Sequence, residues 1–195
     1  MFARMMKLLS QMVFWLLGWH VNNQIPKEVK HFVMIAAPHT SNWDLLFARG
    51  AFYIMGIPLK FTIKKEWVKF PLNLIMKPLG AIPIDRKPKN GGLRKKRMVN
   101  VMADLFKEHE ESLVILITPE GTRSLAKKWK TGFYRIATEA NVPIALGYLD
   151  YPIKEAGIGK LIYTTGDFKK DMEEINAFYS KKTAKFPKKF SVHKL

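Results

Sequence analysis

A histidine and an aspartate five residues apart are the side chains of this sequence with the clearest chemical potential. His39 follows the apolar run 32–37, which predicts a buried strand, and Asp44 lies where the next helix is expected to begin. Ser41 or Asn42 suits the N-cap of that helix. A tight turn would bring the carboxylate to one ring nitrogen, fix the tautomer and leave the other nitrogen to accept a proton. The pair predicts a general base for a hydroxyl, against the plainer interpretation of a solvated helix start.

A second group of chemically useful residues follows the most apolar strand expected in the chain, 113–117. The run 118–124 reads Thr-Pro-Glu-Gly-Thr-Arg-Ser. Gly121 permits close approach of the backbone to a ligand and can donate its N–H, while Arg123 can bind two phosphate oxygens. The glycine-lysine-serine/threonine ending of a nucleotide-binding phosphate loop is missing. The run therefore predicts an anion-binding turn, with an ordinary tight turn capped by serine and threonine as the alternative.

Further basic residues follow other predicted strands. Arg86 comes just after the strand 81–84 and is placed either for a phosphate or for a surface ion pair. Lys64 follows the strand 59–63, and Lys130 stands at the start of a helix, where anions are favoured. Because the carboxyl ends of strands in an α/β sheet form a ligand crevice, we expect these cations to line one site.

Strand-like and helix-like segments alternate along the chain and position these residues. Continuous apolar strands between amphipathic helices predict an α/β fold, with a layered, mixed, mostly parallel sheet flanked by helices. We expect a helix within 1–21, a polar connector over 22–30 and one domain over 22–180, followed by a basic, partly mobile C-terminal tail over 181–195. The expected strands are 31–37, 59–63, 81–84, 113–117, 143–148 and 158–165; the expected helices are 42–55, a broken stretch at 65–79, 91–109, one around 133–140, and 168–180.

Composition narrows the classes of function. The 195 residues are 48% hydrophobic and include no cysteine, which indicates one globular domain without disulfides or thiolate catalysis. The five histidines lack zinc-like spacing, so no metal site is expected. The formal net charge of +17 indicates a polyanionic partner, either nucleic acid or anionic lipid.

The N-terminal segment favours lipid as that partner. Its apolar stretch, 8–19, is too short to cross a bilayer, which needs about 20 residues. Trp15 and Trp19 suit a membrane interface, and Arg4 and Lys7 suit anionic headgroups. We therefore expect an amphipathic helix at the membrane interface. The alternatives are a helix that packs in the core and a signal peptide, although no small-residue cleavage motif follows.

Four blocks in one order carry a resemblance to a known family. They are His39 to Asp44, Ile82-Pro83-Ile84-Asp85-Arg86, Pro119-Glu120-Gly121-Thr122-Arg123 and Val142-Pro143-Ile144. Over about residues 31–150 the chain resembles the glycerophospholipid acyltransferase superfamily, most closely the short bacterial 1-acyl-glycerol-3-phosphate acyltransferases. Trp43 departs from the residue that many relatives have before the acid, which leaves the acceptor open.

The resemblance implies an O-acyltransferase domain with no cofactor beyond its thioester donor, acyl-CoA or acyl-carrier protein. His39 would be the catalytic base and Asp44 its orienting partner, with the Gly121 amide or a neighbouring one as oxyanion donor. The acceptor would be a lysophospholipid at the cytoplasmic face of an anionic membrane, with the enzyme peripheral or monotopic. The residues expected to bind substrate, from the strand-end positions and the resemblance together, are Lys64, Arg86, Glu120, Gly121, Thr122, Arg123 and Lys130.

Three other functions remain open from the sequence. The first is acyl transfer to a different lyso-lipid, such as an amino-acid lipid, or phospholipid remodelling by transacylation. The second is nucleic-acid binding, which the charge favours but which no sequence motif supports. The third is a non-catalytic scaffold at a membrane surface.

Overall fold

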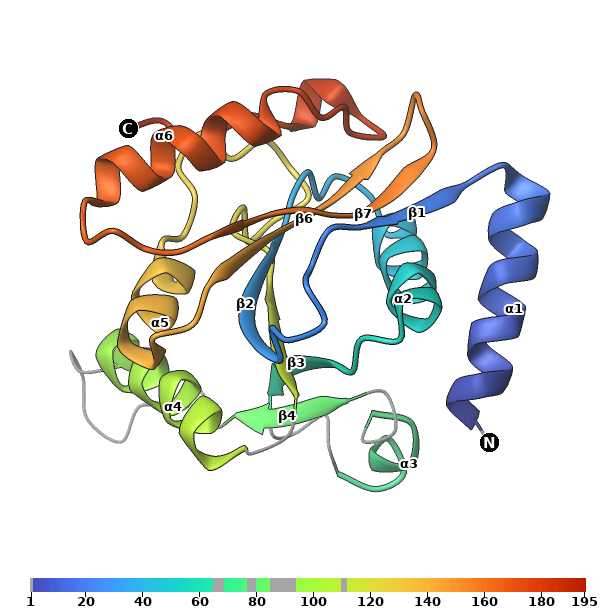
Figure 1. The fold of residues 1–195 in the computed structure, drawn as a ribbon, viewed down its shortest axis with the longest axis horizontal. Helices are drawn as coiled ribbons and strands as arrows, with labels where there is room; N and C mark the ends of the chain where they lie inside the picture. The colour runs from blue at the N-terminus through green and yellow to red at the C-terminus, as the bar shows by residue number, and fades with distance from the viewer. Residues whose placement is uncertain (1, 65–68, 77–79, 85–93, 110–111) are drawn as a thin grey trace.

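The computed structural model describes residues 2–64, 69–76, 80–84, 94–109 and 112–195. They form a mixed α/β fold, as the alternation of apolar strands and amphipathic helices predicts (Figure 1). The strands are β1 His20–Asn23, β2 His31–Ala36, β3 Leu59–Lys64, β4 Ala81–Ile84, β5 Leu113–Ile117, β6 Ile144–Asp150 and β7 Glu155–Ile162. The α-helices are α1 Phe2–Leu17, α2 Trp43–Met55, α3 Asn73–Met76, α4 Arg94–Glu108, α5 Gly132–Ala140 and α6 Phe168–Tyr179.

The seven strands form one sheet in the order β1-β7-β6-β2-β5-β3-β4. The pairs from β6 through β2, β5 and β3 to β4 are all parallel, while β7 runs antiparallel to β6 and parallel to β1. The carboxyl ends of β2, β3, β4, β5 and β6 therefore lie at one edge of the sheet. The turns that carry the candidate site residues start from this edge.

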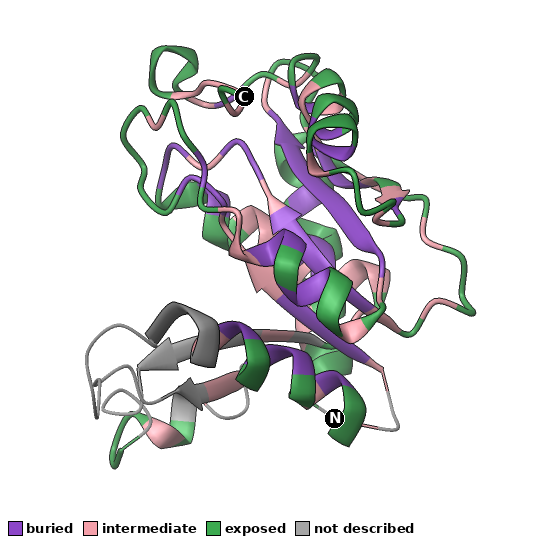
Figure 2. Cartoon of the chain, turned by 90° about the vertical axis from the view of Figure 1, so that its left-hand side faces the viewer, coloured by how far each residue is buried: buried purple, intermediate pink, exposed green. Residues whose placement is uncertain are grey.

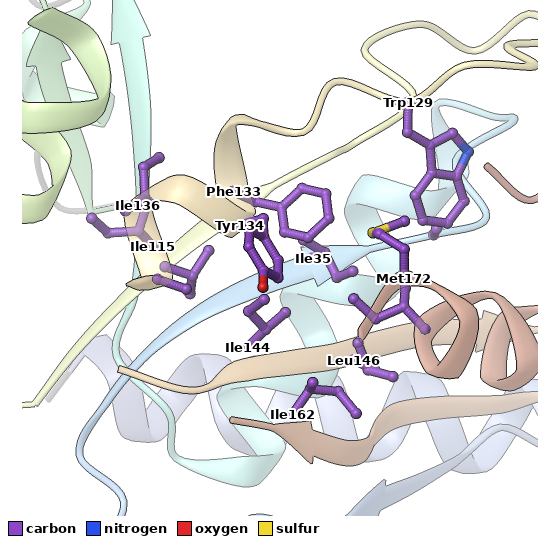
Figure 3. Packing of buried hydrophobic residues seen from close by; sticks show 14 of the residues in the cluster. Ile35, Ile115, Trp129, Phe133, Tyr134, Ile136, Ile144, Leu146, Ile162 and Met172 are labelled. Carbon is purple, nitrogen blue, oxygen red and sulfur yellow. The ribbon is translucent and has the colours of Figure 1, made fainter. Parts of the chain in front are cut away.

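Helices cover both faces of the sheet, so the central strands are buried on both sides (Figures 1 and 2). Alternate residues of β2 divide between the faces: Val33 and Ile35 contact the cluster under α4, α5 and α6, while Phe32 and Met34 contact the cluster under α2. Figure 3 shows the larger cluster, in which Phe133 of α5 packs against the apolar strand residues. This two-sided burial explains why the strands read as continuous apolar runs rather than alternating ones.

Helix α1 lies outside α2 and packs against it through a narrow stripe. The ring of Phe14 is buried on α2, and a Cβ atom added at Gly50 would lie 2.8 Å from that ring, so a glycine at this position allows the close approach. Most other side chains of α1 are exposed, although many are large and apolar. The alternative of a helix that packs in the core therefore holds only for the side of α1 that carries Phe14.

Two segments differ from the sequence expectation. The expected connector 22–30 begins with the end of β1, which is too short and too polar to show strand periodicity but gains its hydrogen bonds by pairing with β7. The final strand begins at Glu155 rather than 158, because the antiparallel pairing with β6 extends it. Strand β7 therefore joins a near neighbour in the chain, β6, to a distant one, β1, which forms the outer strand of the sheet.

Residues 181–195, expected as a partly mobile tail, lie against the domain as the C-terminal segment. Ala184 is buried, the Tyr151 N–H donates to the Thr183 carbonyl oxygen at 3.1 Å, and the Trp129 N–H donates to Nδ1 of His193 at 2.9 Å. These contacts bring the segment beside the turns at the carboxyl edge of the sheet. The lysine-rich composition did not predict this packing, because the backbone and a few apolar side chains make the contacts.

Candidate active site

The turn between β2 and α2 brings His39 and Asp44 together. His39 leaves the carboxyl end of β2, and Asp44 occupies the first turn of α2, beginning at Trp43. Nδ1 of His39 lies 3.3 Å from Oδ2 of Asp44. The imidazole is 24% exposed and the carboxylate 5%, so the ring reaches the surface while its partner is buried. The five-residue spacing therefore produces the contact expected from the sequence.

Asp44 is held by hydrogen bonds on both carboxylate oxygens. Oδ2 accepts from the backbone N–H groups of Thr40 and Ser41, each at 2.8 Å, and Oδ1 accepts from the Tyr151 hydroxyl at 2.6 Å. Burial raises the pKa of Asp44, but the hydrogen bonds from His39, Tyr151 and the two backbone N–H groups outweigh it and lower the pKa below its usual value. Asp44 is therefore a stable anion beside the imidazole.

The N-cap differs in detail from the expectation for this turn. Asn42 occupies the N-cap position but makes no side-chain capping hydrogen bond, while the Ser41 hydroxyl accepts from the Trp43 N–H at 3.2 Å. Asp44 itself binds the amides of the turn. The same carboxylate thus stabilises the helix start and faces the imidazole, so both interpretations of Asp44 describe this side chain.

With Nδ1–H directed to Asp44, Nε2 of His39 keeps its lone pair and can accept a proton. The buried carboxylate stabilises the imidazolium that results, and the carboxylate remains ionised throughout. The arrangement is chemically suited to general-base activation of a hydroxyl.

Glu120 reaches the same turn from the loop after β5. Its Oε1 accepts from the backbone N–H of His39 at 2.7 Å, and its side chain is buried. Burial raises the pKa of Glu120 to about 7, the nearby Asp44 charge adds to that rise, and the hydrogen bond from His39 opposes it. Within the described residues Oε2 is buried without a hydrogen-bond partner. Glu120 therefore binds the backbone of His39, the candidate base, whereas the resemblance implied a substrate-binding role.

The rest of the turn after β5 is tightly folded and mostly exposed. The Gly121 N–H donates to the Thr118 carbonyl oxygen at 3.1 Å, so the amide that we expected for an oxyanion is already engaged. Gly121 has φ 66°, a left-handed conformation that favours glycine, and the Lys130 side chain lies over it. The Thr122 hydroxyl accepts from the Ser124 N–H at 3.2 Å. This part matches the alternative of a capped turn.

An apolar cavity of about 330 Å³ opens beside the histidine, between the sheet and α2. Its wall includes His39, Asp44 and Arg123, which follow the carboxyl ends of β2 and β5. Mostly small or apolar side chains complete it, among them Met34, Ala36, Ala48, Phe52, Met55 and Leu116. An extended hydrocarbon chain fits such a lining, and a polar group at its end would meet the imidazole and the guanidinium.

The other expected substrate residues divide into two groups. Arg123 lines the same cavity as His39. The side chain of Lys130 lies over Gly121, which is in the same turn as Arg123. Lys64 ends β3 at the same edge of the sheet, while its side chain and the whole of Arg86 lie outside the described part of the chain.

Tyr151 is the functional candidate that sequence reasoning missed. It follows β6, whose carboxyl end adjoins that of β2, and its hydroxyl crosses to Asp44. No motif in the sequence marks it, because its partner is 107 residues away.

Comparisons with known proteins identify the family and the fold of the chain. Residues 19–150 match a family model described as Acyltransferase. The crystal structure of the 1-acyl-sn-glycerophosphate (LPA) acyltransferase PlsC from Thermotoga maritima shares the fold, with a TM-score of 0.58 and 17% identity over 91% of this chain and 78% of that one. No match is found among curated proteins. The family model confirms the predicted resemblance to acyltransferases, and since it spans most of the sequence, the chain belongs to the acyltransferase family.

Proposed function

We propose that this protein transfers a fatty acyl group from an acyl thioester to the free hydroxyl of a lysophospholipid such as 1-acyl-glycerol-3-phosphate. The observation that carries the proposal is the contact of His39 Nδ1 with the buried Asp44 carboxylate at the wall of an apolar cavity. The donor is acyl-CoA or acyl-carrier protein. Family membership supports acyl transfer, and the shared fold with the Thermotoga 1-acyl-sn-glycerophosphate acyltransferase supports this class of acceptor.

In the proposed reaction, Nε2 of His39 takes the proton of the acceptor hydroxyl while that oxygen attacks the thioester carbonyl carbon. The tetrahedral intermediate collapses, the carbon–sulfur bond breaks, and the histidinium returns the proton to the thiolate. The products are the ester and the free thiol, so no acyl-enzyme is required. Asp44 stabilises the imidazolium, and Arg123 is suited to an acceptor anion at the same wall.

Exposed apolar residues indicate how the lipid substrates arrive. Leu8, Trp15 and Leu16 of α1 are more than half exposed, as are Leu45 and Leu46 of α2. Leu45 also lines the apolar cavity, so the cavity opens where apolar side chains reach the surface. No helix within the described residues is long and apolar enough to span a bilayer. We propose that this face lies on an anionic membrane at its cytoplasmic side, with α1 in the interface.

The test is incubation with labelled acyl-CoA, or acyl-carrier protein, and a panel of lysolipids, with products identified by mass spectrometry. His39→Ala should lower turnover by roughly 10²- to 10⁴-fold while the chain remains folded. His20→Ala, at an exposed position of β1, is the matched control. Turnover retained in His39→Ala would refute the base. Absence of any acylated product with the wild type would refute acyl transfer itself.

A further inference from the structure

The C-terminal segment reaches the loop that carries the histidine. The Phe186 N–H donates to Oγ1 of Thr40 at 3.3 Å, and Thr40 is itself buried next to His39 in the chain. Residues of this segment therefore line the space in front of the α2 N-terminus. None of the sequence motifs includes this segment.

A second cavity of about 390 Å³ lies at this junction. Three cationic side chains line it: Arg123 from the turn after β5, and Lys185 and Lys189 from the C-terminal segment. The other lining residues are Thr40, Ser41, Asn42, Trp43 and Phe186. Arg123 and Asn42 also line the apolar cavity that contains His39, so the two spaces adjoin. One space is apolar and the other is cationic, with the candidate base at the wall of the apolar one.

The three cations of this second cavity lack carboxylate partners in the part of the chain that the structure describes, where no Asp or Glu oxygen comes within 4.0 Å of their charged nitrogens. Nζ of Lys185 instead lies 5.1 Å from the centre of the Trp43 ring, and Nζ of Lys189 lies 4.9 Å from that of Phe186. By contrast, Lys182 of the same segment has Asp150 3.6 Å away. Three like charges around one hollow repel one another until an anion enters.

We propose that Lys185 and Lys189 extend the anion site expected at Arg123, so that this cavity binds a phosphate group of a substrate while the acyl chain occupies the adjoining apolar cavity. The inference rests on the proposed function and deepens it, because it assigns two lysines of the C-terminal segment to substrate recognition. A guanidinium that bonds phosphate oxygens in pairs and two ammonium groups that act as point charges suit a phosphate dianion. The N-terminus of the 13-residue helix α2 adds a favourable dipole.

Two substrates bring phosphate to this position. A lysophospholipid acceptor carries it a few bonds from the reacting hydroxyl, and acyl-CoA carries it on the donor. In either case phosphate binding would hold the reacting group near the base and reduce the entropic cost of the encounter. The shared chemistry is a phosphate beside an acyl chain.

The experiment compares Lys185→Ala/Lys189→Ala with Lys181→Ala/Lys188→Ala, a control pair that removes the same charge at exposed positions outside the cavity. Four substrate combinations separate the sources: 1-acyl-glycerol-3-phosphate or monoacylglycerol as acceptor, each with acyl-CoA or a short acyl-N-acetylcysteamine thioester as donor. We expect the cavity pair to raise KM at least tenfold for the phosphate-bearing substrate, with kcat nearly unchanged and with no such rise in the control pair. Lys185→Arg should retain most of the binding.

The pattern of KM values gives the result. A rise confined to 1-acyl-glycerol-3-phosphate assigns the acceptor phosphate, and a rise confined to acyl-CoA assigns the donor phosphates. KM values that do not change, or that change equally in the control pair, overturn the proposal. Calorimetric titration of wild type and variants with glycerol 3-phosphate tests phosphate binding in the cavity without turnover. If the protein acylates no acceptor, the proposed function is refuted, and the calorimetric result still decides whether the cavity binds phosphate.

Discussion

The Tyr151 hydroxyl donates to Oδ1 of Asp44 at 2.6 Å, on the side of the carboxylate away from the turn amides. The tyrosine follows β6 and the aspartate begins α2, so the hydrogen bond joins the sheet edge to the helix that orients His39. We infer that Tyr151 is a positioning residue, acting on the base through Asp44.

Tyr151→Phe should lower kcat roughly tenfold, equivalent to about 1.4 kcal/mol of transition-state stabilisation, and leave KM nearly unchanged. The loss leaves a buried carboxylate oxygen without its donor and should cost about 1.5–3 kcal/mol of unfolding free energy. The pKa of Asp44 should rise, because the hydrogen bond that favours its charged form is lost. Steady-state kinetics and a ¹³C NMR titration of Asp44 measure these effects. Tyr163→Phe, at an exposed position, is the control, and an unchanged pKa of Asp44 would exclude the positioning role.

Glu120 should make folding stability fall between mildly acidic and neutral pH. Its pKa is about 7 in the folded protein against 4.5 ordinarily, so the unfolded chain releases this proton first as pH rises. Stability linked to Glu120 is therefore present below pH 4.5 and is lost as pH rises through 7, by up to about 3 kcal/mol.

Glu120→Gln removes that titration and keeps an acceptor for the His39 N–H. In urea unfolding at a series of pH values, the unfolding free energy of the variant should rise relative to that of the wild type between pH 4.5 and 8. Glu173→Gln, at an exposed position, should run parallel to the wild type. Parallel curves for Glu120→Gln as well would show that the carboxyl group titrates normally.

Leu8→Glu should weaken binding to vesicles that contain phosphatidylglycerol by roughly tenfold or more. A leucine side chain that enters the bilayer contributes about 1.5–3 kcal/mol to the binding free energy, and the variant loses this contribution. Leu8 is 61% exposed on α1, so the change should leave the fold intact. Gln11→Glu introduces the same charge at an exposed polar position of the same helix and is the matched control. Vesicle co-sedimentation measures the effect; equal loss in both variants would indicate charge alone, and no loss would remove α1 from the interface.

Ala48→Leu should shift the donor preference toward shorter acyl chains. Ala48 lines the apolar cavity from α2, and the larger side chain occupies space that the proposed acyl group would use. Each excluded methylene costs about 0.8 kcal/mol, so kcat/KM for the longest thioesters should fall about tenfold or more relative to short ones. A series of acyl-CoA lengths measures this shift. Ala177→Leu, at an exposed position of α6, is the control, and a uniform fall over all lengths would contradict the assignment of the cavity.

Much of the fold follows from patterns local in sequence. The run 113–117 is apolar throughout because β5 is covered on both faces, and the apolar stripe of α5 marks its inward side. Strand β1 shows no such pattern, since its four residues gain stability only from pairing with β7. The contact of His39 with Asp44 was predictable for the same reason, because a single turn connects them.

By itself the sequence determined the family, the alternation of strands and helices, and the His39–Asp44 pair, because each depends on residues close together in the chain or on motifs in a set order. Only the tertiary structure decided that Tyr151 binds Asp44, that Glu120 binds the His39 backbone, that the Gly121 amide is already engaged, and that Lys185 and Lys189 line one cavity with Arg123. All but the Gly121 contact join residues dozens of positions apart, and which distant groups meet is set by strand order and packing rather than by local pattern.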